Sequence, residues 1–411
     1  MQEQPRYAVG IDVGTKTVRA VVAHIDGVTG APKIVGVGTS ANSGMKKGVV
    51  SNLTGPASAI DLALEQAERM SGFQVEQATF SINGSHILST KADGMVAVGS
   101  QNNEVSQDDI ARLEEVAMTG KVPANREILE VVPHSYRLDG QDNIKNPIGM
   151  SGTRLEMRAN VVSCLAPHVA NIQKVAEMLK VQIDSLVPAV LASAQAVLSE
   201  SQMDNGVAVV DIGASTTGVA VFEEGDLQYV SVIPVGSQNV TNDLAIGLKV
   251  DPEIAEEVKL AHARFGGESA GEVETKIDKQ FYKFAQTEID EIVEARFEEI
   301  FEAVNKELKR AGVAGKLPSG VVLVGGGSKV KNLADFAKEQ LGLAVRQGVP
   351  RGFVGVSEEV SSPEFASSVG LMLIDATERA TKGHFGGSSA GADKALKKAG
   401  GFFGWLLAKF R

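Results

Sequence analysis

Two segments of this sequence match each other, and the match restricts the fold more than any other feature. They read VGIDVGTKTVRAVV at residues 9–22 and VVDIGASTTGVAVF at residues 209–222. In each, a β-rich run ends in aspartate, Gly-x-x-Thr follows, and a second β-rich run begins. This pattern predicts two strands joined by a glycine turn. We therefore expect two related halves, each beginning with such a hairpin.

Glycine turns of this kind suit phosphate, because without a Cβ the backbone amides can approach the phosphate oxygens closely. A third glycine-rich stretch, VGGGS at residues 324–328, follows a predicted strand in the second half. One such turn alone is most simply a hairpin, whereas three in this order favour a nucleotide site. The sequence has no G-x-x-x-x-G-K-[ST] pattern, which excludes the P-loop class.

The predicted roles at this site divide by motif. The two hairpins would face the β- and γ-phosphates with Gly14, Thr15, Lys16, Gly213, Ser215, Thr216 and Thr217. Asp12 and Asp211, at the strand ends, would hold Mg²⁺ through water molecules, because magnesium keeps most of its hydration. The third stretch would lie beside the adenine and the α-phosphate of ATP with Gly325, Gly326, Gly327 and Ser328.

Changes of pattern along the chain divide it into segments. Residues 280–312 read as one long amphipathic helix, and the Gly-, Ser-, Ala- and Lys-rich residues 383–400 read as a flexible linker. The predicted segments are residues 1–84 with 166–200 as a first lobe, 85–165 as an inserted α+β subdomain, 201–250 with 317–382 as a second lobe, 251–316 as its helical subdomain, 383–400 as the linker and 401–411 as a terminal helix.

The end of the chain differs in charge from the rest. The net charge is −11, yet residues 394–411 hold five basic residues and no acid. A helical wheel of the last ten residues puts most of the apolar side chains on one arc, with basic groups at its flanks. The residues concerned are Phe402, Phe403, Trp405, Leu406, Leu407, Lys409, Phe410 and Arg411.

Two hypotheses account for this tail: a helix docked on the protein's own body, or a helix lying in an anionic membrane surface. The preceding linker and the basic flank favour the membrane helix. The acidic charge of the whole chain argues against nucleic acid as the main partner.

The order of the three glycine motifs resembles that of the actin, heat-shock chaperone and sugar-kinase superfamily. The resemblance implies an α/β, actin-like two-lobed ATPase fold, with the inserted α+β subdomain in the first lobe and the amphipathic helix at the carboxyl end. In actin, the helix before the second hairpin carries a glutamine that positions the attacking water. Gln195 in QAVLSE has the matching place, which implies a catalytic role with Asp211. The alternative is a polar helix residue with no such role.

Within that superfamily, residues 34–53, 144–152 and 232–248 resemble the bacterial cell-division FtsA family, as does the position of the insertion. Two stretches depart from the family pattern. The second hairpin has Gly-Ala-Ser-Thr in place of Gly-Gly-Gly-Thr, and residues 265–275 are shorter and less basic than expected. The resemblance otherwise runs along nearly the whole chain.

This resemblance implies a protein that binds ATP and Mg²⁺ and polymerises with itself on the cytoplasmic face of the inner membrane, at the division site. It would bind the carboxy-terminal peptide of FtsZ and recruit later division proteins, and a useful rate of ATP hydrolysis stays an open question. The helical subdomain would receive the peptide through Arg296 and Glu299, although an ordinary i,i+3 ion pair explains these residues nearly as well. Glu294 would touch the ribose.

Three other classes of protein fit the sequence less well. A small-molecule kinase needs a substrate cleft with its own catalytic aspartate, and no clear candidate is present in the sequence. A chaperone ATPase needs a substrate domain after the ATPase, where this chain has a linker and an amphipathic segment. A pilus-assembly relative shares the insertion, and the terminal helix is the feature expected to separate it from the FtsA-like group.

Overall fold

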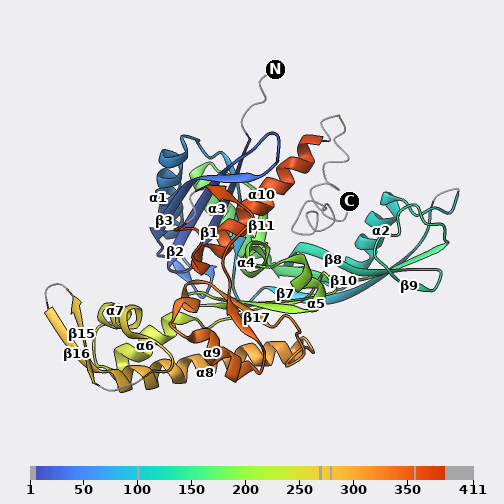
Figure 1. The fold of residues 1–411 in the computed structure, drawn as a ribbon. Coiled ribbons are helices and arrows are strands. Elements are labelled where there is room, and N and C mark those ends of the chain that lie inside the picture. The colour runs from blue at the N-terminus through green and yellow to red at the C-terminus, as the bar shows by residue number, and fades with distance from the viewer. Residues whose placement is uncertain (1–5, 100–101, 268–270, 278–279, 356–357, 385–411) are drawn as a thin grey trace.

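The fold has two lobes with a third unit at the side, as Figure 1 shows for this computed structural model. The structure describes residues 6–99, 102–267, 271–277, 280–355 and 358–384. Each lobe is built on its own sheet, and the inserted subdomain extends away from the point where the lobes meet. The predicted α/β fold class with an inserted α+β subdomain is therefore confirmed.

The first lobe is a six-stranded mixed sheet covered by helices on both faces. In sheet order its strands are β11 (Gln182–Pro188), β6 (Gln77–Ile82), β1 (Arg6–Val13), β2 (Thr17–Ile25), β3 (Pro32–Ala41) and β19 (Val354–Gly355). One face packs on α1 (Thr54–Ser71) and α3 (Ala166–Leu179), and the other on α4 (Ala189–Val197) and α10 (Ala366–His384). Because both faces are buried, β1 and β2 are nearly continuous apolar runs.

The second lobe and the inserted subdomain share one nine-stranded sheet. The lobe contributes β18 (Val345–Gln347), β17 (Val321–Val324), β12 (Val207–Ile212), β13 (Thr217–Glu223) and β14 (Asp226–Ile233). The insertion continues it with β7 (Leu88–Ala97), β10 (Arg154–Leu165), β8 (Arg126–Leu138) and β9 (Gln141–Ile144). The two parts join through the pairing of Ser231 with Leu88. The insertion thus belongs to the first half in sequence but contacts the second lobe in space.

Within the insertion, α2 (Gln107–Met118) covers the sheet, and Ser106 caps its amino-terminal end. The Ser106 side chain accepts from the amide of Asp109, and the Asp109 carboxylate accepts from the amide of Ser106. This reciprocal pair satisfies two of the free donors at the helix start.

The helical subdomain of the second lobe differs in one respect from the prediction. Residues 280–285 form β16 (Gln280–Ala285), which pairs with β15 (Glu272–Ile277), so the long helix α8 begins at Gln286 and ends at Arg310. Phe281, Tyr282 and Phe284 are aromatic residues that favour strands. The expected apolar face of α8 is confirmed, because Ile289, Val293, Phe297, Ile300, Phe301 and Val304 are all buried.

The remaining elements complete the two lobes. They are β4 (Met45–Lys46), β5 (Val49–Val50), α5 (Glu200–Asn205), α6 (Ser237–Gly247), α7 (Pro252–His262), α9 (Leu333–Leu341) and the short 3₁₀ turns η1 (Gly326–Lys329) and η2 (Pro363–Phe365). Within the described ranges, no helix is long and apolar enough to cross a lipid bilayer.

The chain returns to the first lobe near its end, which differs from the predicted extent of the second lobe to residue 382. Strand β19 pairs with β3 in the first sheet, and α10 packs against β1 and α4. The sequence contained no local sign of this return, because α10 is held by partners that are far away along the chain.

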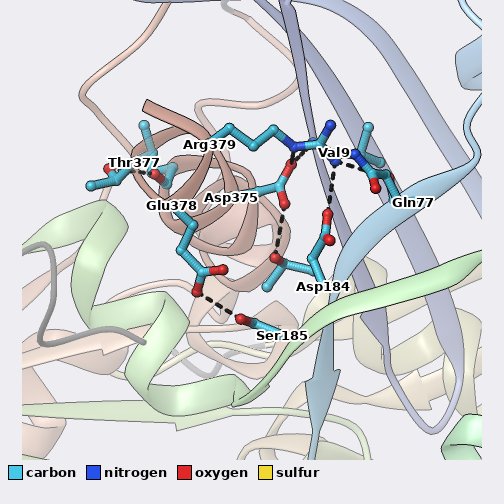
Figure 2. A network of polar contacts seen from close by, with 10 residues as sticks. Val9, Gln77, Asp184, Ser185, Asp375, Thr377, Glu378 and Arg379 are labelled. Atoms are coloured by element: carbon cyan, nitrogen blue, oxygen red, sulfur yellow. Dashed lines mark hydrogen bonds and ion pairs between the residues drawn. The ribbon is translucent and has the colours of Figure 1, made fainter. Parts of the chain in front are cut away.

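Those partners form a polar network that Figure 2 shows between α10 and the first sheet. Asp375 accepts from the Val9 amide at 2.8 Å and from the Thr79 hydroxyl at 3.1 Å. Arg379 donates to Asp375 at 2.8 Å and to Asp184 at 3.0 Å. Burial raises the pKa of Asp375 to about 6, although Arg379 opposes that shift. Through Asp375 and Arg379, the network therefore holds α10 against three neighbouring strands of the first sheet, β1, β6 and β11.

Candidate nucleotide site between the lobes

The two hairpins and the third glycine stretch open onto one cleft of about 740 Å³ between the lobes. The turn between β1 and β2 faces the turn between β12 and β13, and the loop from β17 into η1 lies beside the second turn. The predicted residues that line this cleft are Asp12, Gly14, Thr15, Lys16, Asp211, Gly213, Thr216, Gly325, Gly326 and Gly327. Segments more than 100 residues apart thus meet at one site.

Five predicted residues do not line the cleft. They are Gln195, Ser215, Thr217, Glu294 and Ser328. The hydroxyl of Thr217 donates to the carbonyl of Val235 at 2.9 Å, and that of Ser328 donates to the carbonyl of Gly325 at 2.8 Å, so both serve the local backbone. Glu294 is exposed on α8.

Helix α4 presents a different residue to the site than the one predicted. Ser193 donates to the Asp211 carboxylate at 2.7 Å. Successive helical residues are about 100° apart, so Gln195 points roughly opposite to Ser193. Gln195 is buried, and its Oε1 has no partner among the described residues. The catalytic role of Gln195 stays a prediction that this geometry does not support.

Two aspartates face each other across the cleft at the ends of β1 and β12. Burial raises the pKa of Asp12, with Arg19 acting against the shift. Burial also raises the pKa of Asp211 to about 6; the hydrogen bond from Ser193 lowers it and the charge of Asp12 raises it. Ser367 donates to Asp12 at 3.1 Å. Burial thus destabilises the charged form of both carboxylates. Together with the nearby serine hydroxyls they offer only oxygen ligands, which fits a hydrated Mg²⁺.

Glycine is required where the loops close on this pair. Gly325 has φ +81°, and a Cβ built on it would lie 2.4 Å from Asp211 Oδ1. A Cβ on Gly14 would lie 2.5 Å from the carbonyl oxygen of Thr17. Any side chain at these positions would displace backbone or a cleft carboxylate. The absence of Cβ atoms here is therefore what lets the main chain line the site.

A charged cluster on α7 also lines the cleft, although no local pattern in the sequence indicates it. The Lys16 ammonium in the first lobe lies 2.7 Å from Glu256 Oε1 in the second lobe. Lys259 lies 2.7 Å from Glu256 Oε2 and 2.8 Å from the Thr241 hydroxyl. Burial would raise the pKa of Glu256, but hydrogen bonds from Lys16, Lys259 and Thr241 lower it to about 2. In sequence, Glu256 and Lys259 resemble an ordinary solvated i,i+3 pair.

Three further cleft residues were also absent from the prediction: Arg19, Asn83 and Lys329. Lys329 lies 3.1 Å from Glu364, and Arg19 lies 3.6 Å from the same carboxylate. Asn83 donates from Nδ2 to the Thr216 hydroxyl at 3.2 Å. With Lys16 and Lys259, these cations make the cleft a favourable place for an anionic ligand even though the chain as a whole is acidic.

The predicted partner residues line a second hollow, of about 310 Å³, between α6 and α8. Arg296 lies 2.5 Å from Asp243 and 2.5 Å from Glu299, so the ion pair weighed as the alternative is present. Ile246, at the same hollow, is 77% exposed. An unusually exposed isoleucine beside an arginine is an arrangement suited to a peptide.

The predicted linker is wrong at its start, because Gly383 and His384 belong to α10. The rest of the linker and the terminal helix lie outside the described residues, with Phe402, Phe403, Trp405, Leu406, Leu407, Lys409, Phe410 and Arg411. Their predicted membrane role is not tested by the structure.

Comparison with known proteins decides the family. A family model described as "Cell division protein FtsA" matches residues 208–370, and one described as "SHS2 domain inserted in FTSA" matches residues 84–163. The cell division protein FtsA of Pseudomonas aeruginosa is 36% identical over 90% of this chain and 89% of its own length. This chain belongs to the FtsA family of cell division proteins. The FtsA proteins of Bacillus subtilis and Escherichia coli are 34% and 32% identical, each over 89% of this chain and over 82% and 90% of their own lengths.

Solved structures agree that the FtsA-family fold seen here is actin-like. A PilM–PilN type IV pilus biogenesis complex superposes with a TM-score of 0.66 at 17% identity, over 90% of this chain and 98% of the other. MreB5 of Spiroplasma citri bound to AMPPNP gives 0.55 at 12% identity, over 92% and 98%. A MamK double helical filament gives 0.51 at 13% identity, over 90% and 98%. At these identities the likeness concerns the fold alone.

Proposed function

We propose that this FtsA-family protein binds ATP with Mg²⁺, polymerises on the cytoplasmic face of the inner membrane, tethers FtsZ filaments there and recruits later division proteins. The observation that carries the proposal is the cleft, in which two homologous hairpins, two facing aspartates and a glycine loop converge. The role is primarily that of a structural adaptor, with at most weak ATP turnover.

The nucleotide part of the proposal is supported by the chemistry of the cleft. Glycine backbone at Gly14, Gly213 and Gly325 would receive the phosphates, and the nearby lysines would balance their charge. Bound Mg²⁺ would neutralise charge on the β- and γ-phosphates, with Asp12 and Asp211 holding its water ligands. MreB5, which shares the fold, has been solved with AMPPNP.

The membrane and filament parts support each other physically. A terminal helix of about ten residues binds lipid reversibly, because it must be ordered on binding and is marginal in water. Many tails on one polymer bind firmly, since each later tail binds at a high effective concentration. MamK, with the same fold, forms a double helical filament.

Removal of residues 402–411 is expected to abolish membrane binding. With ATP, Mg²⁺ and anionic vesicles, the full chain should co-sediment as filaments, whereas a chain ending at Gly401 should stay in the supernatant. Trp405→Glu is the milder variant and should weaken binding, because it removes apolar area and adds a repelled charge. Neutral vesicles serve as the control and should bind the full chain less. Equal binding of the full and shortened chains would mean that the tail docks on the protein's own body.

Ile246→Asp is expected to lower the affinity for the FtsZ carboxy-terminal peptide at least about tenfold, because a bound peptide would cover this exposed isoleucine and a charge there would have to be desolvated. Fluorescence anisotropy with a labelled peptide measures this. Val28→Asp is the matched control, since Val28 is 96% exposed and lies in the turn between β2 and β3. If both variants bind as the wild type does, the peptide binds elsewhere.

A pilus-type adaptor is the second candidate, because the PilM complex has the highest TM-score among the structures compared above. The identities of 32–36% to FtsA proteins, over about 90% of the chain, favour the division role. A kinase is disfavoured, because both aspartates that line the cleft from the hairpins belong to the phosphate site.

A further inference from the structure

The short turn after β6 contacts the second phosphate hairpin directly and the first one through Gly48. Asn83 lines the cleft and donates to the hydroxyl of Thr216 on the second hairpin at 3.2 Å. On the first hairpin, the Thr15 hydroxyl accepts from the amide of Gly48 at 3.1 Å. Gly48 in turn packs on this turn so closely that a Cβ built on it would lie 2.9 Å from the amide nitrogen of Gly84. A displacement of either hairpin would therefore change the contacts that residues 83 and 84 make.

The same turn leads directly into the inserted subdomain. The His86 ring nitrogen Nε2 lies 3.0 Å from the carbonyl oxygen of Asn83. Arg126, the first residue of β8, donates to the carbonyl of His86 at 2.5 Å and to the hydroxyl of Ser163 on β10 at 3.0 Å. A continuous series of hydrogen bonds thus runs from the second phosphate hairpin to two strands of the insertion.

The base of the insertion is tightly packed where this series enters it. The ring of His86 stacks on that of His168, with centroids 4.1 Å apart and planes inclined by 25°. His168 lies on α3, directly after β10 leaves the insertion. The entry and exit of the subdomain are therefore held against each other, and a displacement of the turn moves the base of the insertion instead of being absorbed by a loose linker.

We propose that Asn83 is a positioning residue that couples occupancy of the phosphate site to the setting of the inserted subdomain. The inference rests on the proposed function, because it needs ATP to bind in the cleft. A phosphate against the second hairpin would accept the proton of the Thr216 hydroxyl, whose oxygen accepts from Asn83 at 3.2 Å. The two bonds are compatible, so a bound phosphate would fix the orientation of that hydroxyl and strengthen its bond from Asn83. Asn83 would then hold the turn that carries His86, and through it Arg126, in one position. Such a difference in contacts between two states is what lets a ligand shift a conformation.

A second route from the cleft to the insertion exists and must be separated from this one. The insertion contacts the second lobe where Ser231 pairs with Leu88 and where Lys145 lies 2.5 Å from Asp226. A movement of the whole second lobe would reach the insertion through these contacts without involving Asn83.

The experiment is hydrogen–deuterium exchange of the full chain with and without ATP and Mg²⁺, free of vesicles and at concentrations where sedimentation shows a monomer. Peptides from β7 and β8 report on the insertion. In the wild type, ATP should change their exchange rates severalfold. In Asn83→Ala this change should disappear, while affinity for a fluorescent ATP analogue changes by no more than about tenfold, the size expected for one neutral hydrogen bond.

Two variants make the result specific. Asn42→Ala is the matched control, because the Asn42 side-chain amide donates to the Gly14 carbonyl on the first hairpin at 2.7 Å and does not lead to the insertion. It should keep the ATP response in β7 and β8. Arg126→Gln, outside the cleft, should lose that response with its ATP affinity unchanged.

Several outcomes would overturn the proposal. In the first, the wild type binds ATP but the exchange rates of β7 and β8 do not change. In the second, the ATP-induced change in these rates survives in Asn83→Ala. In the third, the change is lost only in Lys145→Met, which breaks the second route. A wild type that does not bind the ATP analogue at all would overturn the nucleotide function itself, and the coupling with it. Retained thermal unfolding transitions in each variant exclude misfolding as the cause.

Discussion

Replacing Asp211 by asparagine is expected to lower the affinity for ATP in the presence of Mg²⁺ by about 10- to 100-fold, the usual effect of losing an outer-shell metal partner. The same change should stabilise the nucleotide-free protein. At pH 7 the wild type holds two facing carboxylates in a buried site, and the pKa of Asp211 is raised from 3.8 to about 6. An asparagine has almost the same shape but no charge to desolvate, so a gain of about 1–3 kcal/mol in the free energy of unfolding is expected.

Isothermal titration with ATP and Mg²⁺, together with urea unfolding of the nucleotide-free protein, measures both effects. The stability gain has a defined pH window. A raised carboxyl pKa destabilises the folded state above about pH 6 and not below about pH 4, so the advantage of asparagine should fade between these values. Asp61→Asn, at an exposed position on α1, is the control and should change neither quantity. Unaltered ATP affinity in Asp211→Asn would remove the aspartate pair from the proposed site.

Replacing Gly370 by valine is expected to cost about 3 kcal/mol or more in the free energy of unfolding, or to prevent folding. Gly370 lies where α10 crosses α4, and a Cβ built on it would lie 1.7 Å from the carbonyl oxygen of Ala192. The obstacle is backbone, so no side-chain rotation relieves it, and the two helices must separate. Ser367 on α10 donates a hydrogen bond to Asp12 in the cleft. Any Gly370→Val protein that still folds should therefore bind ATP poorly as well.

Denaturant unfolding followed by circular dichroism tests this prediction. Ala376→Val adds a β-branched side chain at a half-buried position on the same helix and should cost less than about 1 kcal/mol. An unfolding midpoint for Gly370→Val equal to that of Ala376→Val would show that the α10–α4 contact adapts easily and contributes little to stability.

The site was predictable where one short segment carries both the turn and its ligand chemistry. The hairpins at Asp12 and Asp211 and the stretch at Gly325 were found because glycine turns leave a local signature. Ser215 and Thr217 belong to the same hairpin as Gly213, yet they do not line the cleft. Ser215 lies in the turn itself, and the hydroxyl of Thr217, at the start of β13, donates to the carbonyl of Val235. The motif located the turn correctly but did not reveal which side chains face inward.

Partners from separate segments were beyond sequence reasoning. Glu256 pairs with Lys16 across the cleft, and Asn83 reaches Thr216, but neither contact has a local sign. Gln195 was selected by resemblance, and the structure instead turns Ser193 toward Asp211. Helix orientation depends on what α4 packs against, which here is α10 from the far end of the chain.

The sequence by itself determined the family, the two related hairpins, the glycine loop and the amphipathic face of α8, because turn chemistry and apolar periodicity are local properties. It also carries the predicted membrane tail, which remains a prediction. Only the tertiary structure decided that β19 and α10 return to the first lobe, that residues 280–285 form a strand, and that the insertion joins the sheet of the second lobe. Each of these depends on pairing between distant segments, whose free energy is gained only when both partners are already in place.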